Sequence, residues 1–132
     1  ATYSPQADSQ QSLALPGYGY LAAAIDVGPP DAERIVELIR ATGTEMRAGG
    51  ITADEFERAL QPRLAQARSA LQSNEYWLYS VMFGAERFPQ VLDEARTMLA
   101  DTQAQTLDEV QALATRYLDP ARAVPVLILP QG

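Results

Sequence analysis

The sequence predicts an α+β fold, in which a mainly antiparallel sheet (an N-terminal hairpin plus a C-terminal strand) is covered on one face by several helices. Three observations predict it. An apolar stretch resembling a strand, YGYLAAAIDV, occupies residues 18–27. Between residues 31 and 118, apolar residues recur at helical spacing, and two Thr-x-x-Glu capping boxes begin helices. The apolar run AVPVLIL then lies near the C-terminal end.

Length and composition restrict the class of protein. The 132 residues are enough for one core, so we expect a single domain over 1–132. The net charge of −7 argues against nucleic-acid binding, which needs clustered Lys and Arg, and against docking on an anionic membrane. No apolar run approaches the roughly 20 residues of a membrane span. The chain contains no Cys and no His, so it offers no thiolate nucleophile, imidazole base or usual zinc ligand.

The N-terminal hairpin is predicted from two segments and the turn between them. Thr2–Asp8 reads as a short strand with polar side chains on alternate positions. Pro16-Gly17 signals a turn, after Leu13 and Leu15. Tyr18–Val27 is apolar on both faces, which predicts cover on at least one of them.

The first two helices follow in order. Pro29-Pro30-Asp31 begins one that ends at Gly49-Gly50, with an apolar stripe of Ile35, Leu38, Ile39 and Met46. The Thr52–Glu55 capping box begins the next. Pro62 lacks an amide donor and clashes with the preceding turn, so we expect a kink or break over 58–61.

Three helical segments and a strand complete the chain. The aromatic stretch 74–83 should be largely buried, and an amphipathic helix follows around 91–99. A second capping box, at Thr106, begins a helix that stops before Asp119-Pro120. Ala123–Leu129 is predicted to be a strand, which Pro125 places at an edge or irregularity of the sheet.

Few residues suggest chemistry by themselves. Carboxylates at Asp54, Glu55 and Glu57 have two interpretations, a metal site or a helix cap, and their place in the first helical turns favours the cap. The same holds for the pairs 93–94 and 108–109. Aromatic residues at helical spacing are more often core than ligand groove, which is the choice for Tyr76, Trp77 and Tyr79. Asn74 is interpreted as a helix N-cap rather than a ligand residue.

Several segments, taken together and in order, resemble a known family. They are TYSP, DVGPP, GITADEFERA, NEYW and TLDEVQALATRYLDPARAVPVLILP. The chain resembles the C-terminal domain of the pitrilysin/insulinase family of zinc metallopeptidases, whose zinc motif is inverted, and is most similar to its bacterial members. The resemblance covers almost the whole chain. GIT-x-x-E-F-E-R-A and Y-L-D-P-x-R-A are its most specific parts.

The resemblance implies a function in a larger protein. In that family zinc is held by a His-x-x-Glu-His motif and a later Glu in an N-terminal domain. Because this chain has no His, we expect a truncated C-terminal part of a zinc-dependent endopeptidase, with no metal site and no catalytic residue of its own. Its expected partners are the N-terminal zinc-binding domain and a peptide or unfolded protein substrate.

Tyr3 is the candidate substrate-binding residue. Catalytic family members carry an Arg and a Tyr seven residues apart near the scissile carbonyl, and Tyr3 matches that tyrosine. The Arg would precede Ala1. A phenol can donate a hydrogen bond to the carbonyl oxygen as negative charge develops there. The other interpretation of Tyr3 is an ordinary strand aromatic.

Two further functions stay open. The parent protein is alternatively a non-catalytic structural or partner subunit of the same family, and the chain is alternatively a free-standing ligand-binding domain. If part of the domain is missing, apolar surface should be exposed, and we expect a homodimer through a strand edge or an apolar face. Analogy with bacterial relatives favours a periplasmic or membrane-associated location.

Overall fold

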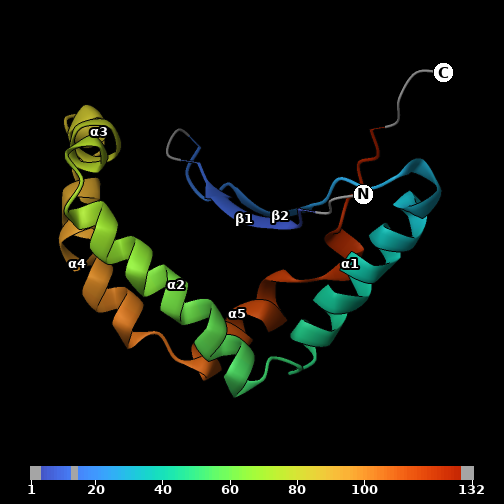
Figure 1. Cartoon of the computed structure of the whole chain (residues 1–132). Helices are drawn as coiled ribbons and strands as arrows, with labels where there is room; N and C mark the ends of the chain where they lie inside the picture. Colours follow the sequence, from blue (N-terminus) through green and yellow to red (C-terminus); the bar gives the residue numbers. More distant parts are fainter. Residues whose placement is uncertain (1–3, 13–14, 129–132) are drawn as a thin grey trace. The chain divides into compact units, whose positions relative to one another are not determined.

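The computed structural model describes residues 4–12 and 15–128, and Tyr3, Leu13 and Leu129 therefore lie outside the described residues. It confirms the α+β class, with a two-stranded antiparallel sheet and helices (Figure 1). The chain divides into two compact units, one formed by residues 1–49 and 114–132 and the other by residues 50–113. The expectation of one domain over 1–132 concerns cooperative folding and stays a prediction.

The hairpin of the first unit pairs β1 (Gln6–Gln11) with β2 (Gly19–Ala24) in the register Gln6↔Ala24. The Pro16-Gly17 turn is confirmed, because Gly17 has a φ of 77°, a backbone conformation that favours glycine. Gly19 is required by close approach: a Cβ there would lie 2.9 Å from the carbonyl oxygen of Gln10. β1 begins and ends later than the predicted strand over 2–8.

The sheet is smaller than predicted. Residues 123–128 are not a strand, and within the described residues the sheet has only its two hairpin strands. Pro125 lacks the amide that a ladder needs, and Val124 and Ile128 on either side of it are exposed. Every residue of both strands is exposed.

The first unit also contains a helix whose two ends were predicted. η1 (Pro29–Asp31) leads into α1 (Ala32–Arg47), and Gly49 follows with a φ of 96° and donates its amide to the carbonyl of Met46. The end of α1 is tied to residue 115: Arg47 Nε donates to the Thr115 carbonyl at 3.2 Å, and the Thr115 hydroxyl donates to the Arg47 carbonyl at 3.1 Å.

Helices make up the second unit, which contains α2 (Ala53–Leu71), η2 (Tyr76–Met82), α3 (Phe83–Ala85) and α4 (Gln90–Ala104). α5 (Leu107–Tyr117) begins in this unit and ends in the first, before η3 (Pro120–Arg122). α2 and α4 lie side by side (Figure 1). η2 is a π-helix, in which the amide of Phe83 donates to the carbonyl of Leu78, five residues back.

The predicted break at Pro62 is wrong, because α2 runs through Pro62 without interruption. A proline inside a helix costs about 3 kcal/mol. Burial of Leu64 and Ala67 beyond it, and the capping box at Thr52 before it, offset that cost. Interactions on both sides of the proline therefore stabilise the helix.

Small side chains dominate the core. Six described residues are buried, and four of them are alanines: the six are Ala32, Leu64, Ala67, Val81, Ala95 and Ala114. The stretch 74–83 is less buried than predicted, because only Val81 in it is buried, at 1% exposure. Small residues let helix backbones approach closely but bury little apolar area each.

Leu64→Ala should destabilise the protein by about 2–5 kcal/mol, because it opens a cavity where a leucine side chain is now buried. Urea unfolding followed by circular dichroism measures the change. Leu113→Ala, the same substitution at a leucine that is 53% exposed, is the matched control and should cost less than about 1 kcal/mol. Equal costs at the two positions would show that Leu64 is not a core residue.

Candidate functional site

Tyr3, the residue proposed from sequence to contact substrate, lies outside the described residues. The described part of the chain starts two residues before β1, at Ser4. The position of the Tyr3 side chain therefore stays a prediction, and the site must be built from the described residues.

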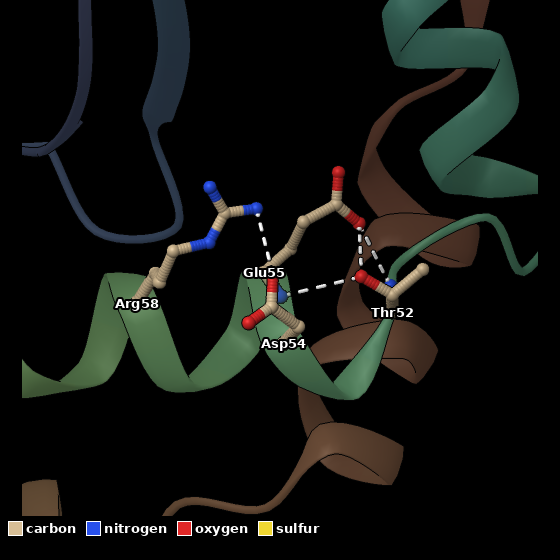
Figure 2. Close-up of polar contacts among 4 residues, drawn as sticks. All are labelled: Thr52, Asp54, Glu55 and Arg58. Atoms are coloured by element: carbon tan, nitrogen blue, oxygen red, sulfur yellow. Dashed lines mark hydrogen bonds and ion pairs between the residues drawn. The ribbon is translucent and has the colours of Figure 1, made fainter.

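The carboxylates at the start of α2 form a helix cap (Figure 2). The Thr52 hydroxyl accepts from the amide of Glu55 at 3.2 Å, and the Glu55 carboxylate accepts from the Thr52 amide at 2.9 Å and from its hydroxyl at 2.7 Å. Asp54 forms an ion pair of 2.9 Å with Arg58, one turn further on. The interpretation of this group as a cap is confirmed.

Two hydrogen bonds lower the pKa of Glu55 below its usual value. The larger effect is that of the Thr52 hydroxyl, followed by the Thr52 amide, and Arg58 adds a smaller attraction. Glu55 is fully exposed, so solvent screens these effects. The carboxylate is nonetheless stabilised in its charged form, which suits a cap and not a proton donor.

One member of each of the other two acidic pairs has a structural partner. Asp93 forms an ion pair of 3.0 Å with Arg96. The Glu109 carboxylate accepts from the amide of Thr106 at 3.0 Å, which confirms the second capping box. Among residues 4–12 and 15–128 no group of three or more acidic side chains is arranged to hold a metal ion.

Tyr76 and Trp77 connect η2 to its neighbours. The Trp77 indole N–H donates to the carbonyl of Leu71 at 2.9 Å, and the Tyr76 hydroxyl lies 3.7 Å from the sulfur of Met98. The two rings contact edge to face, with 5.7 Å between centroids. Ser73, not Asn74, caps this segment, since its hydroxyl accepts from the Tyr76 amide at 3.3 Å. The predicted capping role of Asn74 is therefore wrong.

Two open grooves lie on either side of Tyr76 and Ser80 in the second unit. The first has a volume of about 530 Å³ and is lined mainly by small or hydroxyl-bearing side chains of α2 and η2, with Glu75 as its charged residue. The second has a volume of about 360 Å³ and lies between η2 and α4, with Glu94 and Asp101 in its wall. The lining of both grooves contains carboxylates and no arginine.

Sequence reasoning missed the second groove. Its α4 residues recur at helical spacing, as Val91, Glu94, Ala95, Met98, Asp101 and Thr102, and the C-cap residue Gln105 follows. The sequence predicts an amphipathic helix around 91–99 and cap residues at 93–94, but this prediction did not place Glu94 and Asp101 on one face with the apolar residues. Acidic residues inside an otherwise apolar stripe are the signal that identifies such a face.

The lining of the grooves offers hydrogen-bond acceptors and negative charge. Carboxylates, hydroxyls and a phenol accept hydrogen bonds, and carboxylates attract cationic groups. The lining therefore suits amide donors and basic side chains, such as those of an extended peptide.

Comparisons of the chain with protein-family models, with curated proteins and with solved structures found no match. Within the described residues, no helix is both long enough and apolar enough to cross a membrane.

The contribution of Glu55 to stability should depend on pH. Because the folded pKa is lowered from 4.5, this contribution is present above pH 4.5 and is lost as the pH falls through the folded value. Glu55→Gln should remove it, so the free energy of unfolding should fall less steeply below pH 4.5 than in the wild type. Chemical denaturation over a series of pH values measures this slope.

Asp54→Asn is the matched control, because Asp54 lies beside Glu55 but pairs with Arg58 on the surface. A slope unchanged in Glu55→Gln would contradict the assignment. Thr52→Ala, which removes the hydroxyl, should cost about 1 kcal/mol at neutral pH.

Proposed function

We propose that this chain is the C-terminal, zinc-free part of a zinc-dependent endopeptidase of the pitrilysin/insulinase type, and that it forms part of the wall that holds a peptide substrate. The observation that carries the proposal is the ordered series of family-like segments from TYSP to the final AVPVLILP. The partners it requires are the N-terminal zinc-binding domain and an unfolded peptide.

Three of the family-like segments occupy distinct places in the described fold, which supports treating them as separate signals. GITADEFERA contains the capped start of α2. TLDEV contains the capped start of α5. In YLDPAR the Asp119 side chain accepts from the amide of Ala121 at 3.1 Å and so caps η3. Each of these segments caps a helix, and a capping motif by itself can occur in any fold. The evidence for the family is therefore the common order of the segments and not any single one of them.

The residues of this chain do not fit a zinc site. Protein zinc sites are built mainly from His and Cys with some carboxylates, and the sequence contains neither His nor Cys. We therefore assign no zinc-dependent step to this chain. Its proposed contribution is to bind and orient the peptide, with the Tyr3 phenol donating a hydrogen bond to the carbonyl oxygen that becomes negative.

Tyr3→Phe should lower kcat of the polypeptide that carries this chain together with the zinc domain by about 10²–10³-fold, because one donor to the developing oxyanion is lost. KM should change little, since the interaction forms mainly in the transition state. Tyr18→Phe, at an exposed tyrosine of the hairpin segment, is the matched control. Steady-state kinetics on an unfolded peptide measures both variants.

An unchanged kcat in Tyr3→Phe would remove Tyr3 from the mechanism. The sequence upstream of Ala1 separates this function from its alternative. A His-x-x-Glu-His motif with a later Glu supports the peptidase. Its absence, together with activity only when another subunit is added, supports a non-catalytic partner subunit.

The groove that contains Glu94 and Asp101 should bind basic peptides better than acidic ones. The double variant Glu94→Gln/Asp101→Asn should weaken binding of an Arg-rich unfolded peptide by about threefold to tenfold, because each exposed ion pair contributes less than about 1 kcal/mol. Fluorescence anisotropy of the labelled peptide measures the affinity.

Glu57→Gln/Asp108→Asn removes the same charge away from both grooves and is the control for net charge. Equal weakening in the two double variants would assign the binding to overall charge and not to the grooves.

A further inference from the structure

Four large apolar side chains of the second unit are exposed on one short helical segment. Leu78 and Tyr79 belong to η2, Met82 ends it, and Phe83 begins α3. Their exposed fractions are 55%, 71%, 63% and 87%. We call these four residues the apolar patch. Leu78 and Met82 are four positions apart, as are Tyr79 and Phe83, so each pair consists of neighbours on the surface of the helical segment.

The packing of η2 explains why this surface faces solvent. Val81 is the buried member of the segment and lines the groove beside α4. Tyr76 is half-buried, and its hydroxyl contacts the sulfur of Met98 in α4. With those residues turned toward α4, the positions on either side of Val81 are left without cover from the described residues.

A groove adjoins the apolar patch on the same unit. It is the 530 Å³ groove between α2 and η2, and Tyr79 belongs to both. Its other lining residues include Ser69, Ala70, Ser73 and Ser80, which leave room for an inserted side chain. In a two-fold symmetric contact, each copy must present both the inserted side chain and the groove that receives it. The exposed Phe83 and the open groove of small residues meet this requirement on one unit.

We infer that the apolar patch and this groove form the contact surface of a homodimer, in which Phe83 of each copy enters the groove of the other. The exposed area of the apolar patch is consistent with a second copy of the chain as the partner. The four side chains present on the order of 600 Å² to solvent, which is the larger part of the roughly 800 Å² per partner of a standard interface. The inference does not depend on the proposed peptidase function.

Charge also favours this surface over the rest of the molecule for self-contact. Two copies, each with a net charge of −7, repel one another, so they can meet closely only where the contact carries little charge. The apolar patch is uncharged, and the groove lining contains one charged residue, Glu75. Added salt should therefore strengthen the dimer by screening the repulsion.

Sedimentation equilibrium of the full 132-residue chain over a range of concentrations tests the inference. The wild type should approach twice the 14.4 kDa mass of one chain, and its dissociation constant should fall as salt is raised. Phe83→Asp should raise that constant at least tenfold, since it places charge in the contact. Ala70→Arg places a large side chain in the groove that receives Phe83, and it should also raise the dissociation constant at least tenfold.

Val124→Asp is the matched control, because Val124 is 83% exposed and belongs to the other unit. It should leave the dissociation constant unchanged. Circular dichroism should show the same helix content in all variants, because each substituted side chain lies at the surface or in the groove wall. A wild type that stays monomeric at high concentration overturns the inference, as does a dimer that Val124→Asp disrupts and Phe83→Asp does not.

Discussion

Close contact between helices through small side chains is the constraint on which the second unit depends. α2 and α4 contact one another, and the residues they bury are mostly alanines, such as Ala67 and Ala95. Alanine permits close approach but removes little apolar area from water. The larger apolar residues of η2 therefore cannot all fit inside, and Val81 alone is fully enclosed.

This constraint shapes the surfaces that are available for binding. Where η2 turns Tyr76 and Val81 toward α4, it leaves grooves on either side of Tyr76 and an apolar patch beyond them. The groove beside α4 carries Glu94 and Asp101 and suits basic ligands, whereas the apolar patch suits another apolar surface and the groove beside α2 is the one inferred to receive Phe83. One helical segment thus separates two kinds of contact, which do not require the same partner.

Structure that depends on local interactions could be predicted from sequence. Both capping boxes, the Gly49 helix end and the Gly17 turn were found at their predicted places, because each rests on contacts within a few residues. The failures concern more distant effects. Pro62 was expected to break α2, but packing beyond the proline outweighed its local cost. Residues 123–128 have strand composition, yet pairing needs a partner edge, and composition does not supply one.

The sequence by itself determined where α2 and α5 begin and where α1 ends, because capping and turn geometry depend on neighbouring residues. It also determined that the chain cannot supply His or Cys ligands. Only the tertiary structure decided which apolar residues are enclosed, and that Glu94 and Asp101 share a groove with Tyr76. The physical reason is that burial depends on how closely helices far apart in sequence can approach, and their smallest side chains set that distance.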